Sequence, residues 1–380
     1  MAPEVLETML PYFSEYYGNP SSMHFFGGQV QKKINEARER VADFLGAEPS
    51  EVVFTSCGTE SDNAAILGTL DSYPEKRHFI TTRVEHPAVG NVSTYLARKG
   101  YRVTELTVDR EGRLDLDELK ESITEETVLV SIMYANNETG VIFPIEEIGE
   151  IVKTKGIPFH TDAVQAAGKI PLNMKKSKID MLSTSGHKLH APKGIGVLYI
   201  QKGTKFSPFL IGGHQEKGRR GGTENVPYII GLGKACELAK KHLDEENTRV
   251  KALRDYLEAK LLEKIPNTLI NGDRVHRLPN TVSVSFEYVE GESILLLLSD
   301  LGICASSGSA CTSGSLEPSH VLRAMGVPFT AAHGSIRFSL SIYNTKEEMD
   351  YIIEHLPPII QKLRDISPFW RDYLKSQGKV

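Results

Sequence analysis

Short β-rich runs alternate with longer amphipathic stretches through residues 51–200, and this alternation constrains the fold more than any other feature of the chain. Strands that alternate with helices predict a mostly parallel sheet that is covered by helices on both faces. Ligands of such sheets bind at the carboxyl ends of the strands. The expected strands span residues 52–55, 78–82, 102–106, 128–133, 158–161, 181–183 and 197–200.

The rest of the chain predicts a second domain, because 380 residues exceed what one small core organises. Residues 226–265 are expected to be helical, with a polar interruption near 244–247, and to lead out of the large domain. After them we expect an α+β unit: strand 280–286, helix 291–300, a Ser/Gly-rich loop 306–315, helix 318–325, strand 335–340 and helix 345–363. The expected organisation is therefore a large α/β domain 1–235, whose residues 1–15 pack with the small domain, a small domain 236–365 and a tail 366–380.

Charge and composition favour a small-molecule substrate. The chain has 44 basic and 49 acidic residues, and its basic residues are scattered, without the stripe or patch that binds nucleic acid or a membrane surface. The longest apolar run, residues 294–298, is too short to span a bilayer, and we expect a cytoplasmic protein. Four widely spaced cysteines predict no disulfide framework, and the histidines form no metal-ligand cluster.

A lysine and a carboxylate follow two of the expected strands. Lys188 ends the run 183–188, and Asp162 stands at the end of the preceding strand. This pair suits a pyridoxal phosphate site, in which the lysine holds the aldehyde as a Schiff base and the carboxylate keeps the pyridine nitrogen protonated. A lysine by itself is more often a solvated surface residue.

A phosphate anchor is expected where the run 52–61 passes from a strand through Gly58 into a helix, because helix N-termini bind phosphate. Thr59 could cap this helix and contact the phosphate, and Ser185 and His187 offer further donors. An ordinary capped turn explains the same pattern when it is taken alone.

Two further residues stand out by their surroundings. Arg337 lies in the middle of an apolar strand, so its partner is either the α-carboxylate of an amino acid or a structural Asp or Glu. Cys311 lies in the polar run 306–314, which contains several glycines. A structural cysteine is usually buried among apolar residues, so this setting favours a reactive cysteine over a structural one. Cys57 and Cys304 are expected to be packing residues.

The segments 162–165, 185–188 and 306–313 together resemble the cysteine desulfurases of the NifS/IscS type, in the class V aminotransferase family. Similar segments occur along nearly the whole chain, at residues 17–22, 85–86, 136–140, 215–223 and 335–339. The resemblance implies the aminotransferase-like fold type I, a homodimer and pyridoxal 5'-phosphate as cofactor. Family members usually open with a strand and an Asp-Asn-x-Ala-Thr-Thr-like turn, whereas this chain opens at Met1-Ala2-Pro3-Glu4, so we expect a misassigned start or a shortened chain.

The resemblance also implies a role for each site residue. It assigns the Schiff base to Lys188, the pyridine nitrogen to Asp162, the ring hydroxyl to Gln165, ring stacking and proton transfer to His86, and a place beside the ring and substrate to Asn137. It assigns the phosphate to Gly58, Thr59, Ser185 and His187, the phosphate of the neighbouring subunit to Thr223, the substrate carboxylate to Arg337, and the transferred sulfur to Cys311.

The implied reaction converts L-cysteine to L-alanine and leaves a persulfide on Cys311 for an iron–sulfur scaffold or another sulfur-acceptor protein. One alternative is a different lyase or aminotransferase of the same fold, including a selenocysteine lyase, for which Cys311 is incidental. Another is a non-catalytic sulfur-assembly subunit.

The tail is expected to contribute to an acceptor site. Trp370, the only tryptophan, lies between Phe369 and Tyr373 beside an arginine, and such aromatic residues are enriched in interface hot spots. The segment also resembles the tail by which IscS-type members dock their scaffold. The alternative is that these residues fold back on the small domain.

Overall fold

The computed structural model describes residues 1–307 and 318–378, and the chain divides into two compact units. Two short segments from the first part of the chain belong to the second unit. Unit 1 comprises Met1–Leu106, Leu116–Ala135 and Pro144–Leu243, and unit 2 comprises Thr107–Asp115, Asn136–Phe143 and Asp244–Val380.

Unit 1 is built on a seven-stranded sheet of order β1-β7-β6-β5-β4-β2-β3. Only β7 runs antiparallel to its neighbours β1 and β6, so the predicted mostly parallel sheet is confirmed. Every strand of this sheet except β3 is buried along its whole length, because helices cover the sheet. The two edge strands are β1 and β3, and only β3 is partly exposed. The strands are β1 (Val52–Thr55), β2 (His78–Thr82), β3 (Arg102–Leu106), β4 (Thr127–Ser131), β5 (Phe159–Asp162), β6 (Met181–Ser185) and β7 (Gly196–Ile200).

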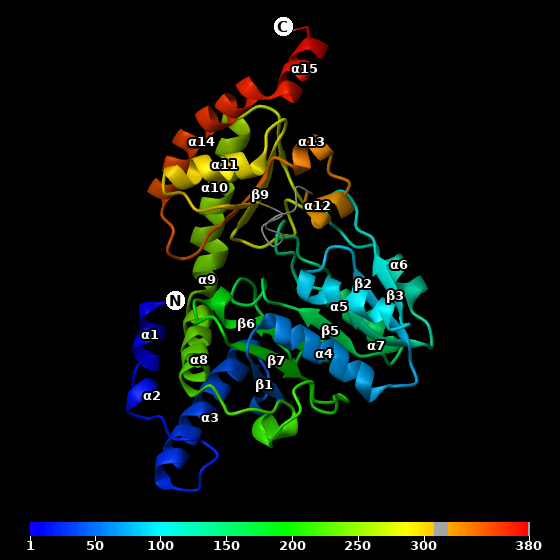
Figure 1. The fold of residues 1–380 in the computed structure, drawn as a ribbon, viewed down its shortest axis with the longest axis vertical. Coiled ribbons are helices and arrows are strands. Elements are labelled where there is room, and N and C mark those ends of the chain that lie inside the picture. Colours follow the sequence, from blue (N-terminus) through cyan, green and yellow to red (C-terminus); the bar gives the residue numbers. More distant parts are fainter. Residues whose placement is uncertain (308–317, 379–380) are drawn as a thin grey trace. The chain divides into compact units, whose positions relative to one another are not determined.

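The helices of unit 1 pack on its sheet and on one another. Helix α4 packs against β4, β5, β6 and β7, while α3 and α8 lie side by side with α1 against α8 (Figure 1). Residues 1–15, which we expected against the small domain, thus begin with a helix that packs on α8 of unit 1, where Met9 fills the space beside Gly231. The helices are α1 (Pro3–Met9), α2 (Pro11–Ser14), α3 (Phe25–Leu45), α4 (Gly58–Ser72), α5 (Pro87–Arg98), α6 (Leu116–Ser122), α7 (Ile145–Thr154) and α8 (Val226–Lys241).

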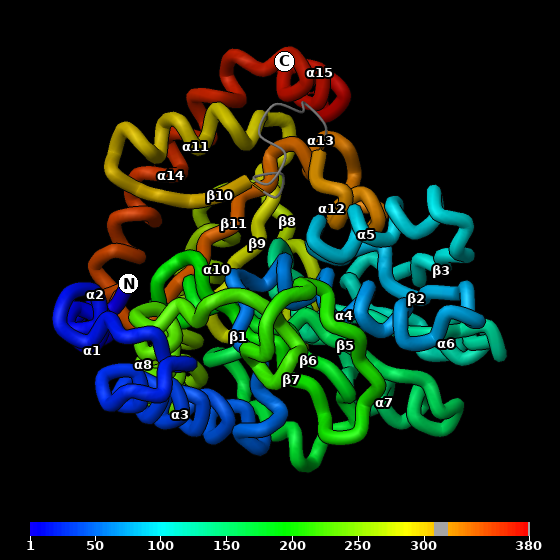
Figure 2. The backbone as a smooth tube through the Cα atoms, turned by 60° about the horizontal axis from the view of Figure 1, so that its bottom comes forward, coloured from blue at the N-terminus to red at the C-terminus, as the bar shows by residue number. Residues whose placement is uncertain are grey.

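Unit 2 contains an antiparallel sheet of order β10-β11-β9-β8 with α10, α11 and α14 packed against it and against one another (Figure 2). Its core is formed by apolar side chains of these helices and of β9 and β11, including Phe286 and Phe338. The strands are β8 (Thr268–Ile270), β9 (Thr281–Phe286), β10 (Ser306–Ser307) and β11 (Ser335–Ser339). The chain passes from unit 1 to unit 2 within α9 (Leu243–Glu245). The other helices of unit 2 are α10 (Lys251–Lys264), α11 (Gly291–Asp300), α12 (His320–Ala324), α13 (Phe329–Ala332), α14 (Lys346–Ile366) and α15 (Pro368–Ser376).

The expected interruption near 244–247 falls where the regular α-helix is broken, because α8 ends at Lys241 and α10 begins only at Lys251. Helix α9 continues into a π-helical turn, Glu246–Val250, which joins α10 directly. Polar residues are compatible with helix on a solvated face, and Glu246 and Val250 supply the buried side of this turn.

The tail forms α15, and its central aromatic residues fold back on unit 2. The Trp370 ring lies 4.6 Å from the Arg364 guanidinium and 5.6 Å from the ring of Tyr288. Tyr373 stacks on Tyr288 at 4.8 Å and accepts a hydrogen bond from Asn267 Nδ2 at 3.1 Å. The fold-back on the small domain considered from the sequence is therefore present, while Trp370 stays half-buried and Phe369 is exposed, and a contribution of the tail to an acceptor site stays a prediction. None of the helices among the described residues is both long and apolar enough to cross a bilayer.

Candidate active site

The carboxyl ends of β5 and β6 carry the carboxylate and the lysine of the expected site. Asp162 is the last residue of β5, is buried, and accepts a hydrogen bond from the Val164 backbone N–H at 2.9 Å. Burial raises the pKa of Asp162 to about 6, and the positive charge of Lys188 acts in the opposite direction. Lys188 is half-buried and lies in the 3₁₀ turn Gly186–Leu189, which follows β6.

The N-terminus of α4 meets this edge of the sheet. Cys57 occupies the N-cap position and makes no side-chain capping bond, so the suggestion that Thr59 caps the helix is wrong. Thr59 lies instead in the first turn, where backbone N–H groups point out of the helix and favour an anion. Cys57 is half-buried, with its sulfur 3.7 Å from Ser56 Oγ, and Cys304 is exposed rather than packed as we expected.

Gly58 brings three expected site segments into contact. A Cβ atom at this position would lie 2.9 Å from Val164 Cγ2 and 3.4 Å from Ser185 Cβ. The start of α4, the turn after Asp162 and the end of β6 therefore touch at a point that has room only for glycine. Ser185 Oγ is in turn 2.8 Å from His187 Nδ1. An uncapped helix start, a hydroxyl and an imidazole around one point fit a phosphate group, and Asp162 and Lys188 beside them fit the ring and aldehyde of pyridoxal phosphate.

His86 begins α5 and has a fixed ring orientation. Its Nδ1 accepts a hydrogen bond from the Ala88 backbone N–H at 3.1 Å, so a neutral His86 ring carries its proton on Nε2. The preceding Glu85 is fully buried, and burial raises its pKa to about 8. Gln165 is half-buried in the turn that follows β5.

Two further site residues, Asn137 and Arg337, belong to unit 2. Arg337 lies on β11 and donates from Nη1 to the carbonyl oxygen of Asn137 at 2.5 Å. The buried Glu138 next to Asn137 accepts a hydrogen bond from Ser319, and burial raises its pKa to about 7 against the opposing charge of Arg337. Arg337 thus has both a backbone acceptor and an acidic neighbour within its own unit. Cys311 lies outside the described residues.

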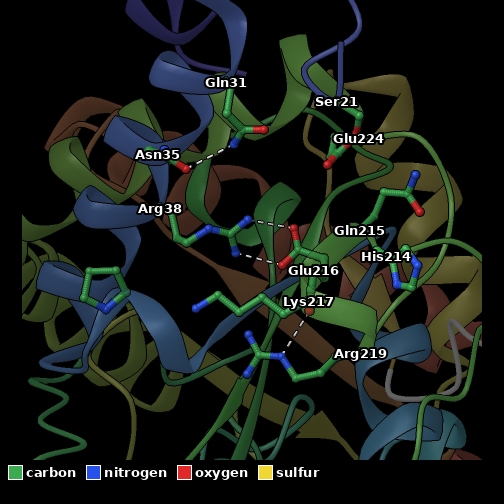
Figure 3. Close-up of a pocket in the computed structure, with 11 residues that line it drawn as sticks. Ser21, Gln31, Asn35, Arg38, His214, Gln215, Glu216, Lys217, Arg219 and Glu224 are labelled. Atoms are coloured by element: carbon green, nitrogen blue, oxygen red, sulfur yellow. Dashed lines mark hydrogen bonds and ion pairs between the residues drawn. The ribbon is translucent and has the colours of Figure 1, made fainter. Parts of the chain in front are cut away.

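The segment that leads to Thr223 is anchored by ion pairs that sequence reasoning missed. Arg38 of α3 holds Glu216 through two bonds of 2.7 Å (Figure 3). Arg220 binds Glu60 of α4 at 2.9 Å. A cavity of about 440 Å³ lies beside the first pair, and Thr223 itself is exposed. The partners of the Arg38 bond are 178 positions apart, so no local pattern in the sequence signals it.

A parallel sheet that gathers an amine, a carboxylate and a helix N-terminus at its carboxyl edge, with a separate α+β unit, defines an enzyme of fold type I. Residues 1–352 match the family model of the class V aminotransferases, and the chain belongs to this family.

Curated relatives and solved structures agree with this membership. The chain is 63% identical over 370 residues to a cysteine desulfurase of Trichormus azollae, and 58% identical over 368 residues to the cysteine desulfurase NifS of Azotobacter vinelandii; each match covers 97% of this chain and 92% of the relative. Among solved structures, a NifS-like protein superposes with a TM-score of 0.90 at 42% identity, over 96% of this chain and 97% of the other. A NifS-like protein from Rickettsia africae gives a TM-score of 0.84 at 34% identity, with the same coverage.

Proposed function

We propose that this protein is a cysteine desulfurase that converts L-cysteine to L-alanine and passes the sulfur, as a persulfide of Cys311, to an iron–sulfur scaffold or another acceptor protein. The family membership and the relatives named cysteine desulfurase support the reaction. The observation that carries the proposal is the contact at Gly58, which joins a helix N-terminus, the Asp162 turn and the strand that leads to Lys188.

The proposed cofactor is pyridoxal 5'-phosphate, which when bound supplies an electron sink for the substrate Cα. Lys188 would hold its aldehyde, Asp162 would pair with its ring nitrogen, and Gln165 would contact its ring hydroxyl. His86 would pack against the ring and carry a proton on Nε2, and Asn137 would contact ring and substrate. Gly58, Thr59, Ser185 and His187 would bind its phosphate.

In the proposed sulfur step, Arg337 orients the substrate carboxylate and the Cys311 thiolate attacks the substrate sulfur. The new S–S bond forms as the Cβ–S bond of the substrate breaks, and the electron pair that stays on Cβ takes up a proton. The products are a Cys311 persulfide and L-alanine, which together contain every atom of the thiol and of L-cysteine. A thiol has a pKa of about 8.5 when unperturbed, so the thiolate requires a proton acceptor, a role we give to His86.

The reaction products distinguish a cysteine desulfurase from an aminotransferase and from a non-catalytic subunit. Incubation of the purified protein with L-cysteine, followed by mass spectrometry, is expected to show one added sulfur on the peptide that contains Cys311, with alanine in solution. A keto acid without a persulfide would instead indicate an aminotransferase, and a protein that binds no pyridoxal phosphate would indicate a non-catalytic subunit.

Substituting Gly58 by alanine is expected to weaken pyridoxal phosphate binding about tenfold, because the new Cβ pushes the Asp162 turn away from α4 at a cost of about 1–3 kcal/mol. Fluorescence titration of the apoprotein with the cofactor measures this change. Gly90→Ala in α5 is the matched control, because no atom lies within 4 Å of a Cβ at that position. Equal affinities for the two variants would contradict the phosphate site.

We also propose a homodimer in which Thr223 reaches the phosphate site of the neighbouring subunit. Ile211, which precedes the Thr223 segment, is 88% exposed, and Phe209 and Leu210 beside it are also exposed. An exposed apolar run of this kind favours a protein interface.

Three described cysteines are free thiols, which supports a reducing and therefore cytoplasmic location.

Ile211→Glu is expected to shift the protein from dimer to monomer in sedimentation experiments and to release cofactor on dilution, because a charge replaces an apolar contact. Val275→Glu is the control: Val275 is 77% exposed but lies in unit 2. A monomeric wild-type protein that keeps its cofactor and full activity would rule out the shared site.

A further inference from the structure

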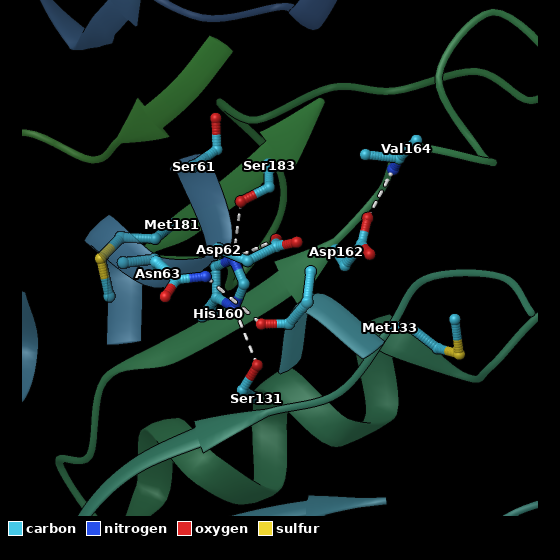
Figure 4. Close-up of polar contacts among 12 residues, drawn as sticks. Ser61, Asp62, Asn63, Ser131, Met133, His160, Asp162, Val164, Met181 and Ser183 are labelled. Carbon is cyan, nitrogen blue, oxygen red and sulfur yellow. Dashed lines mark hydrogen bonds and ion pairs between the residues drawn. The ribbon is translucent and has the colours of Figure 1, made fainter. Parts of the chain in front are cut away.

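A buried polar cluster lies on the face of the sheet that carries Asp162 (Figure 4). His160 precedes Asp162 by two positions on β5, so both side chains project from the same face of the strand. His160 Nδ1 is 2.8 Å from Ser131 Oγ on β4, and its Nε2 is 2.9 Å from Ser183 Oγ on β6. Each neighbouring strand therefore holds one edge of the imidazole ring.

Asp62 of α4 completes this cluster from above the sheet. Its Oδ1 lies 3.7 Å from His160 Nε2, and its carboxyl group lies beside Ser183. Asp62 is 1% exposed and His160 is 0% exposed. Among the described residues, Asp62 Oδ1 is buried without a hydrogen-bond partner, because 3.7 Å exceeds hydrogen-bond length.

This geometry decides where the proton shared by Asp62 and His160 resides. An imidazolium and a carboxylate at 3.7 Å would be two buried charges without a direct hydrogen bond, which is a costly arrangement. A neutral carboxylic acid and a neutral imidazole contain the same number of protons and no charge. Burial shifts both groups toward the neutral pair: it lowers the pKa of His160 to about 3 and raises the pKa of Asp62 well above its usual range.

We propose that Asp62 is an uncharged carboxylic acid which, together with neutral His160, positions β5 and leaves Asp162 as the ionised carboxylate of this edge. The charged or titratable groups around Asp62 come from the adjoining segments: Cys57 before α4, Glu85 after β2, and His160 and Asp162 on β5. An ionised Asp62 would repel Asp162 and favour its protonation, whereas a cofactor with a protonated ring nitrogen requires Asp162 as an anion. The consequence for the cofactor rests on the proposed function; the protonation of Asp62 does not.

The protonation state is tested by infrared spectroscopy of the apoprotein with ¹³C-labelled aspartate carboxyl groups at about pH 7, where exposed aspartates are ionised. We expect a carboxylic-acid C=O band in the wild-type protein that is lost in Asp62→Asn. Asp71→Asn on the exposed side of the same helix is the control and is expected to keep the band. A wild-type spectrum without the band, or a band that persists in Asp62→Asn, would overturn the proposal.

The positioning role is tested by pyridoxal phosphate affinity in two variants of Asp62. Asparagine matches the size and neutrality of the protonated acid, so Asp62→Asn is expected to bind within about twofold of wild type. Asp62→Ala loses the polar contacts with His160 and Ser183 and is expected to bind about tenfold more weakly. Equal weakening in both variants would mean that the charge of Asp62 is required, and no weakening in either would remove its positioning role. A wild-type protein that binds no cofactor would refute the proposed function and leave the infrared result to decide the protonation of Asp62.

Discussion

Replacement of Lys188 by alanine is expected to abolish both the covalent attachment of pyridoxal phosphate and the formation of alanine from L-cysteine. The amine of Lys188 is the group that we assign to the aldehyde, and it stands in the turn directly after β6. Burial raises the pKa of Asp162, and the positive charge of Lys188 lowers it. Without Lys188 the pKa of Asp162 therefore rises, so that more of Asp162 is protonated at neutral pH and it stabilises a protonated ring nitrogen less well. Borohydride reduction followed by peptide mass spectrometry locates the attachment.

Lys193→Ala is the matched control for this experiment, because Lys193 follows the same turn and is exposed. The control is expected to keep the reduced adduct on Lys188 and at least about half of the turnover, in line with the small effects of most surface substitutions. Alanine production at the wild-type rate by Lys188→Ala would show that another group holds the cofactor.

Cys311→Ser is expected to keep cofactor binding and the spectral response to L-cysteine but to lose sulfur transfer by at least about three orders of magnitude, because a hydroxyl is a far poorer nucleophile than a thiolate toward sulfur. The measurement is the mass of each cysteine-containing peptide after incubation with L-cysteine. Cys57→Ser and Cys304→Ser are the controls, and the exposure of Cys304 makes the second of these the more demanding one. A persulfide that disappears in either control and remains in Cys311→Ser would reassign the nucleophile.

The regular parts of the fold could be predicted from local pattern. The bounds of β1, β2 and β3 coincide with the expected runs, because each is a β-rich segment between turn residues. Helix α11 was also expected at its observed bounds. The short strands β8 and β10 were not expected, since three and two residues are too few to establish an alternation and depend on pairing with β9 and β11.

Some residues of the candidate site could likewise be predicted from local sequence pattern, and others depend on contacts between distant segments. Lys188 and Asp162 could be proposed because they stand at strand ends, where the type of fold places its ligands. The role of Cys57 as the N-cap of α4, in place of Thr59, could not, because it depends on the φ and ψ angles of one turn. The partnership of Asp62 with His160 joins a helix to a strand far along the chain, and only the packed structure brings them together.

The bond from Arg337 to the carbonyl oxygen of Asn137 has a consequence for biosynthesis. Its two partners are 200 positions apart, and both belong to unit 2, which also recruits Thr107–Asp115 from the early part of the chain. The ribosome therefore delivers the first pieces of this unit long before the last, and a nascent chain released ahead of β11 contains Asn137 without its arginine. A fragment that starts at Asp244 has the opposite defect. Neither half of the gene encodes unit 2 in full, and shuffling of domains by cutting near residue 243 is expected to yield products that lack this contact.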